Sequence, residues 1–321
     1  MVGKDFNKSQ TMFVDANFGS KNQVSNFMTQ KMQEHNSNFN LIPKVNNQSI
    51  FNESLEELVI TNEYPNPQLV IEYQNDIFTY LKKVEPQFLP KYPYMKGFQT
   101  DINDKMRSIL IDWLIDVHLK FKLLAETLFL TVNLIDRYLE RTIIKRTKLQ
   151  LVGVTAMLIA CKYEEIYAPE VRDFVYITDQ AYTKEEILKT ENHMLNILEF
   201  NITTPSSFRF LEIFSVLLKM DEHSIMFCRY LIELFLVDSK TNKFHPSLKS
   251  AAAIYITLKI TKKNEFDLIS KLSEYPEEKL RECAKDMCLI LDSEEKSSLN
   301  AVKKKFSQPK YLEVSKIKFF N

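Results

Sequence analysis

Apolar residues recur at steps of three and four in two neighbouring stretches of this chain. In the first stretch they are Met106, Ile109, Leu110, Trp113, Leu114 and Val117, and in the second they are Leu128, Val132, Ile135 and Leu139. A spacing close to 3.6 residues places each set on one face of an α-helix. The pattern stops over Lys122–Ala125, a connection of the length that joins antiparallel neighbours in helical domains. These stretches therefore predict two packed helices.

The same periodicity predicts two sets of five helices. The first set covers residues 104–120, 125–140, 147–163, 169–177 and 183–198, and the second covers 206–219, 222–237, 246–261, 264–271 and 276–292. The third member of each set, Leu149–Tyr163 and Ser247–Ile260, is apolar on nearly every side, which is typical of a helix surrounded by others. We therefore expect two helical domains, each built around a central helix, and an internal repeat with a period of about 100 residues.

The regions outside these helices differ in composition. Residues 1–71 hold twelve Asn and six Gln, so we expect a mostly disordered leader, in which Ser54–Ile60 is a candidate for a helix that forms with a partner. Residues 72–103 predict a short helix and a connecting loop, followed by domains over 104–203 and 204–293. The tail, 294–321, is rich in Lys and aromatic residues, and the sequence leaves open whether it packs back or stays mobile.

Glycine is scarce, and this excludes much chemistry. The four glycines are Gly3, Gly19, Gly97 and Gly153. Phosphate-binding loops need several closely spaced glycines so that backbone amides can approach the ligand. Hairpin-rich β folds also use glycine in their turns. We therefore expect an all-α fold and not a nucleotide-binding enzyme.

The titratable residues indicate neither a metal site nor a catalytic centre. The five histidines show no ligand spacing such as His-Glu-x-x-His, and the four cysteines form no Cys-x-x-Cys pair. Adjacent carboxylates such as Glu164 and Glu165 point apart on a helix. We expect no enzyme activity and neither a cofactor nor a metal.

Charge and hydropathy exclude two kinds of partner. The 42 Lys and Arg residues balance 42 Asp and Glu, which leaves no net positive charge to attract nucleic acid. The longest apolar run, Leu151–Cys161, is shorter than the roughly 20 residues of a membrane span, so we expect no membrane contact either. The cysteine pattern favours a reducing compartment, and we expect an intracellular protein.

Three segments resemble the cyclins, and B-type mitotic cyclins first. They are Met106–Leu139, Leu149–Thr183 and, more faintly, Lys303–Ser315, within a resemblance that covers about residues 72–315. The run VRDFVYITD looks equally like an A-type cyclin. The resemblance implies an all-α fold of two tandem five-helix cyclin-box domains with a leading N-terminal helix. It also implies a regulatory subunit that binds and activates a cyclin-dependent kinase, recruits substrates and controls G2/M progression in the nucleus and cytoplasm.

The resemblance assigns two kinds of charged residue. Arg107 and Asp136 match a buried ion pair that joins the first two helices, which is an architectural role. Lys162 and Glu191 match two charged residues that hydrogen-bond the kinase backbone beside its regulatory helix. Without the resemblance, Lys162 would be interpreted as an end residue extending its charge to solvent, and Glu191 as an ordinary solvated charge.

Two apolar sets accompany these charges. The set that matches the kinase contacts is Ile77, Tyr80, Tyr163, Leu195 and Phe200, although each of these alone is also a candidate core residue. The set that matches the docking patch for substrates or inhibitors with Arg-x-Leu motifs is Met106, Ile109, Leu110, Trp113, Leu149 and Gln150, with Asp116 as the acid that meets the motif's cation. Most relatives with this acid carry the longer Glu, and the same stripe is alternatively buried core.

Two other functions remain open from the sequence. A transcription-initiation factor with tandem cyclin-like folds would bind DNA, but it would need a basic face. A non-activating helical scaffold would lack a Lys162 and Glu191 pair in this sequence context.

Overall fold

The computed structural model describes residues 70–91, 93–263, 266–294 and 296–317. The disordered leader expected over residues 1–71 therefore lies almost wholly outside the described residues, as does the candidate helix Ser54–Ile60. Within the described ranges every regular element is an α-helix or a short 3-10 helix, and there is no strand. The all-α prediction is confirmed.

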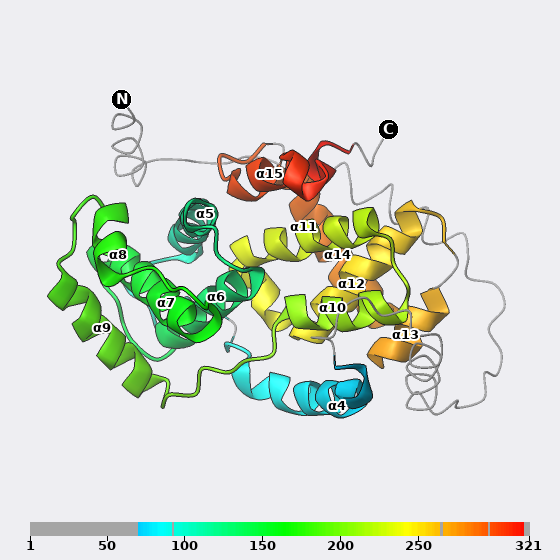
Figure 1. The fold of residues 1–321 in the computed structure, drawn as a ribbon, viewed down its shortest axis with the longest axis horizontal. Coiled ribbons are helices and arrows are strands. Elements are labelled where there is room, and N and C mark those ends of the chain that lie inside the picture. The colour runs from blue at the N-terminus through cyan, green and yellow to red at the C-terminus, as the bar shows by residue number, and fades with distance from the viewer. Residues whose placement is uncertain (1–69, 92, 264–265, 295, 318–321) are drawn as a thin grey trace. The chain divides into compact units, whose positions relative to one another are not determined.

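The first bundle consists of five helices, drawn in teal and green in Figure 1. They are α5 (Asp104–Phe121), α6 (Ala125–Leu139), α7 (Leu149–Glu164), α8 (Val171–Ile177) and α9 (Lys184–Ile197). The other four all pack against α7, whose residues from Leu151 to Cys161 are buried without exception. Gly153 permits the close approach of α5, because a Cβ added there would lie 2.7 Å from Leu110 Cδ1. The apolar pattern therefore predicted the central helix of this bundle.

The second bundle repeats this arrangement. Its helices are α10 (Ser207–Leu217), α11 (Glu222–Val237), α12 (Pro246–Ile260), α13 (Phe266–Ser273) and α14 (Glu277–Glu294). All of the others pack against α12. Ala251, Ala252 and Ala253 on α12 are fully buried, so small side chains allow the neighbouring helices to come close.

Several helices are capped by their own sequence. The Asn103 side chain accepts from Met106 N (3.0 Å) at the start of α5, and Thr183 with Glu186 forms a reciprocal capping box at the start of α9. Two helices are capped from elsewhere in the chain. Glu165 accepts from Leu124 N (2.7 Å) just before α6, and Glu85 accepts from Ser247 N (3.0 Å) in the first turn of α12. These carboxylates satisfy amide groups that a helix start leaves without an intrahelical acceptor.

The leading segment contacts both bundles. The helix α4 (Gln74–Val84) packs its buried Phe78 edge-on against Phe210 and Phe214 of α10. The 3-10 helix η3 (Glu85–Phe88) follows, and Phe88 O accepts from Asn133 of α6 (3.0 Å). The segment before α5 is therefore fixed by hydrogen bonds and apolar contacts.

The tail packs back on the folded bundles. Its helix α15 (Ala301–Phe306) contacts α5 of the first bundle and α11 of the second. The Lys305 ammonium lies 2.6 Å from Glu233 Oε2 in a pair that is 1% and 0% exposed. The 3-10 helices η6 (Pro309–Tyr311) and η7 (Val314–Lys316) follow, and Tyr311 and Val314 are buried.

A buried ion pair lies where α5, α6 and the second bundle meet. Arg107 donates to both carboxylate oxygens of Asp136, at 2.5 Å to Oδ1 and 2.7 Å to Oδ2. Arg107 Nη1 also donates to the carbonyls of Leu236 (3.0 Å) and Val237 (3.1 Å) at the end of α11. Burial alone would lower the pKa of Arg107, but the adjacent Asp136 carboxylate raises that pKa above its ordinary value. Arg107 is therefore a charged residue shared by both bundles.

We predict that Asp136→Asn lowers the free energy of unfolding by about 3–5 kcal/mol, because it leaves the buried Arg107 charge without its counter-ion. Urea unfolding followed by circular dichroism measures this change. The matched control is Asp101→Asn, which breaks the solvent-exposed pair with Arg146 (2.8 Å) and should hardly move the unfolding midpoint. Equal losses in the two variants would contradict the structural role given to Arg107.

Candidate functional site

One candidate surface forms where α7 ends beside α9, and we call it the Lys162 surface. Lys162 Nζ donates to both oxygens of Glu191, at 2.7 Å and 2.9 Å. The Lys162 side chain is 48% exposed and that of Glu191 is 12% exposed. The structure thus brings together two charges that lie 29 residues apart in the sequence and places them at the protein surface.

Exposed aromatic residues follow both helices in the chain, Tyr163 directly after Lys162 and Phe200 just beyond α9. Tyr163 is 47% exposed, and its hydroxyl hydrogen-bonds the Thr203 hydroxyl in the segment between the bundles. Phe200 is 64% exposed and has a φ of +55°, a left-handed conformation that is unfavourable for a bulky side chain. The turn is held by Phe200 N, which donates to Leu195 O (2.9 Å) at the end of α9. The backbone therefore stores strain at a position that directs an aromatic ring into solvent.

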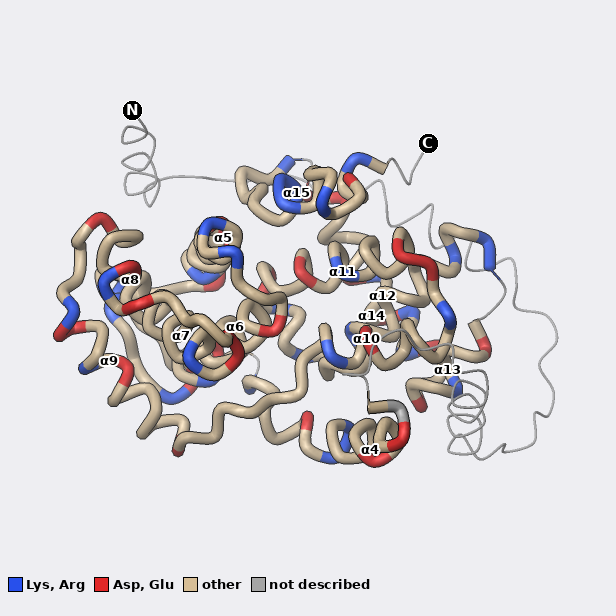
Figure 2. Tube along the Cα trace, viewed as in Figure 1, with Lys and Arg blue, Asp and Glu red and all other residues tan. Residues whose placement is uncertain are grey.

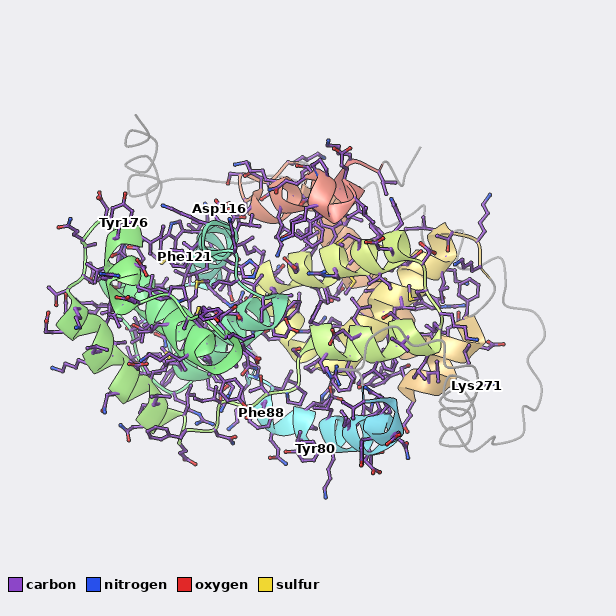
Figure 3. The ribbon with its side chains drawn as sticks, viewed as in Figure 1. Tyr80, Phe88, Asp116, Phe121, Tyr176 and Lys271 are labelled. Atoms are coloured by element: carbon purple, nitrogen blue, oxygen red, sulfur yellow. The ribbon has the colours of Figure 1, made fainter. Side chains whose placement is uncertain are left out.

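Ile77 and Tyr80 come from a different element, the leading helix α4. Tyr80 is 60% exposed (Figure 3), and Ile77 is half-buried. At about 100° per residue, Tyr80 lies on the opposite side of α4 from the buried Phe78, which faces α10, and Ile77 lies between them. They provide apolar surface on α4 that a partner could contact.

Two further exposed apolar residues, Ile166 and Tyr167, lie outside the periodic helical segments of the sequence. They are 89% and 93% exposed, in the loop between α7 and α8. Helical spacing carries no information in a loop, so the only signal was an apolar pair between Glu165 and Pro169. Because Glu165 accepts from Leu124 N (2.7 Å) and the Thr127 hydroxyl (2.5 Å), the start of this loop is tied to α6.

The seven docking-patch residues separate into two groups. Met106, Leu110 and Leu149 are only 7%, 6% and 3% exposed, so the alternative of buried core applies to these three. The accessible group comprises Ile109, Trp113, Gln150 and Asp116. A periodic stripe on a helix shows the same spacing in the core and on the surface, so the sequence could not separate these groups.

Two carboxylates lie along the accessible side of α5. Asp112 Oδ1 accepts from Ala301 N (2.9 Å) at the start of α15, and Asp116, labelled in Figure 3, is exposed one turn further on. Burial raises the pKa of Asp112 to about 6. Asp116 is exposed as a residue, but its carboxyl is partly desolvated, which raises its pKa as well.

The usual metal-ligating side chains are dispersed over the part of the chain that the structure describes. No group of three or more His, Cys, Asp or Glu residues there could hold a metal ion. The four cysteines are unpaired and buried, and burial raises the pKa of Cys161 and of Cys228 to about 12. His118 is buried as well, and burial lowers its pKa to about 3.

Both charge signs are mixed along the described chain, as Figure 2 shows. The sequence carries equal numbers of basic and acidic residues. Among the described helices, none is both long and apolar enough to cross a membrane.

Comparison with protein families gives two adjacent matches. The cyclin N-terminal domain matches residues 76–203 and the cyclin C-terminal domain matches residues 203–319. These matches cover more than half of the chain, which therefore belongs to the cyclin family. The predicted tandem cyclin fold is confirmed.

Individual relatives place the chain with the B-type mitotic cyclins. It is 42% identical over 257 residues to a G2/mitotic-specific cyclin-B of Spisula solidissima, covering 80% of this chain and 60% of that protein. It is 44% identical over 253 residues to a G2/mitotic-specific cyclin-B of Hydra vulgaris, covering 78% and 70%. The chain thus spans less than two thirds of the Spisula relative. The predicted resemblance to B-type cyclins is confirmed.

A solved structure supports the fold independently. A viral cyclin from herpesvirus saimiri aligns with a TM-score of 0.59 and 21% sequence identity, covering 67% of this chain and 97% of the viral chain.

The raised pKa of Asp112 predicts a pH-dependent stability. Its carboxyl has a pKa of about 6 in the folded chain and about 4 in the unfolded chain. As the pH falls from 7 to 4, the folded state therefore takes up this proton before the unfolded state does. We expect the wild-type protein to gain stability relative to Asp112→Asn over that range, as measured by urea unfolding at each pH.

The control is Asp101→Asn, for which we expect the stability difference from the wild type to change in the opposite direction as the pH falls. A backbone hydrogen bond from Arg146 lowers the pKa of Asp101, so the wild type should lose only a little stability relative to Asp101→Asn as the pH falls, as expected for an exposed ion pair. A wild-type to Asp112→Asn difference that is flat from pH 7 to 4 would contradict the burial of this carboxyl.

Proposed function

We propose that this protein is the regulatory subunit of a cyclin-dependent kinase and acts at the G2-to-mitosis transition. Membership of the cyclin family, with similarity to G2/mitotic-specific cyclin-B proteins, supports the proposal. The observation that carries it is the paired Lys162 and Glu191 at an exposed, aromatic-rich surface. The subunit supplies binding energy, and the kinase supplies the chemistry.

Activation follows from differential binding. Active kinases need a regulatory helix to be turned inward, so that its Glu pairs with the Lys that contacts ATP phosphates. A partner that binds only the inward arrangement shifts the population toward it. Under this proposal, the Lys162 surface contacts the kinase beside that helix and stabilises its active position.

The geometry of the Lys162 pair suits this role. The ammonium group has three donor hydrogens and lies within hydrogen-bonding distance of both Glu191 oxygens, and the carboxylate has further acceptor sites. Each group therefore keeps hydrogen-bonding capacity for a partner backbone while the other holds it in place. Preorganisation of this kind reduces the entropy lost on binding.

A second surface, on α5, serves substrate recruitment in this proposal. Its accessible residues, Ile109, Trp113, Asp116 and Gln150, would contact Arg-x-Leu motifs in substrates or inhibitors. The buried Met106, Leu110 and Leu149 support the surface from beneath.

The rival functions have less support. A DNA-binding initiation factor would need a basic face, whereas this sequence is neutral, and none of the similarities above favours it. A scaffold would bind the kinase without activating it. We further propose that the protein has no catalytic activity, uses no cofactor and resides in the nucleus and cytoplasm.

We predict that Lys162→Ala with Glu191→Ala abolishes kinase activation while the thermal melting temperature stays close to that of the wild type. Interface residues of this kind typically contribute about 2 kcal/mol or more to binding each. The measurements are phosphorylation of a short peptide by the purified kinase with each variant, and melting of the free variant.

A matched control lies at the other end of the same two helices. Lys148 and Glu186 form an exposed pair (2.6 Å) between the start of α7 and α9, so Lys148→Gln with Glu186→Gln should leave activation intact. If both double variants lose activation equally, or if the Lys162 variant unfolds, the interface assignment is wrong.

We also predict that Trp113→Ala weakens phosphorylation of substrates that carry an Arg-x-Leu motif but spares a short peptide that lacks it. Trp113 is half-buried on α5 and would supply binding energy remote from the catalytic cleft. Kinase assays with the two substrates give the comparison. Equal losses on both would place Trp113 in the core and remove it from the docking patch.

A further inference from the structure

The tail helix α15 begins directly on α5. Ala301 N donates to Asp112 Oδ1 (2.9 Å), and Ala301 itself is fully buried. The helix is held from the other side by Lys305, 2.6 Å from Glu233, and by Phe306, which packs against Tyr230. The tail is therefore positioned beside the two carboxylates of α5, Asp112 and Asp116.

Two lysines border the buried face of α15, one on each edge. At about 100° per residue, Lys303 lies on the edge next to Phe306, whereas Lys304 lies on the edge next to Ala301 and hence toward α5. Lys303 Nζ is 3.9 Å from Glu294. Lys304 is exposed, and its charge acts on both Asp112 and Asp116, opposing the effect of burial on the pKa of each carboxyl.

The geometry points to Lys304 as a specificity-determining residue of the α5 docking surface, an inference that rests on the docking function proposed above. The ammonium group of Lys304 competes with the cation of a docking peptide for Asp116. The surface therefore selects extended peptides by apolar side chains placed against Ile109 and Trp113. An arginine in the peptide adds little affinity.

Peptide binding to the full chain tests this inference. The probes are a fluorescein-labelled peptide with an Arg-x-Leu motif and the same peptide with Gln in place of Arg, measured by fluorescence anisotropy at low salt. The wild type should bind the two with affinities within about twofold. Lys304→Gln should bind the Arg peptide about three- to fivefold tighter, which is the size of an exposed ion pair, and the Gln peptide as before.

The matched control is Lys303→Gln, which removes the neighbouring charge on the other edge of α15 and should change neither affinity. A wild type that already prefers the Arg peptide more than fivefold, with no further gain in Lys304→Gln, would overturn the inference. So would the absence of binding by either peptide to any of the proteins. Activation of the kinase toward a peptide without a docking motif would show whether the proposed function itself stands in that case.

Discussion

The bonds made by Arg107 and Asp136 are the constraint on which the two bundles depend. Two buried charges are stable only when they are paired and their remaining hydrogen-bonding groups are satisfied. Here the further partners of this pair come from three parts of the chain. Tyr94 donates to Asp136 Oδ1 (2.7 Å) from the loop before α5, and Asn242 donates to Oδ2 (2.9 Å) from the 3-10 helix η5 (Ser239–Lys243) of the second bundle. The carbonyl oxygens of Leu236 and Val237 at the end of α11 accept hydrogen bonds from Nη1 of the Arg107 guanidinium. Any relative movement of the bundles would strand a charge, so the pair fixes their docking.

The sequence predicted the helices well because a helix that buries one face has apolar residues at a regular spacing of three or four positions. The central helices α7 and α12 were identifiable for the same reason, since they lack a polar face. Contacts between segments that are distant in the sequence produce no such spacing. The caps that Glu165 and Glu85 provide to α6 and α12 depend on tertiary packing, and neither carboxylate lies near its helix in sequence.

The sequence predicted some features of the candidate sites and not others. The resemblance picked out Lys162 and Glu191, and the structure adds that they contact each other. The resemblance could not separate the buried Met106 from the accessible Trp113. Both residues belong to the same periodic stripe of α5, and part of that stripe packs inward while part of it faces solvent. The resemblance also could not identify the role of the tail. Lysines are usually exposed, whereas Lys305 of the tail is buried and paired with Glu233.

The length of α7 has a consequence for how the two surfaces work together. Leu149 and Gln150 lie at its first turn and Lys162 lies in its last, so one rigid helix separates the docking surface from the Lys162 surface. Thirteen residues at 1.5 Å each give a separation of about 20 Å. An extended polypeptide advances about 3.3 Å per residue, so in the proposed complex a substrate docked on α5 would need at least roughly six residues to span this distance. Under the function proposed above, the length of α7 therefore sets the distance between a bound docking motif and the point where the kinase is held.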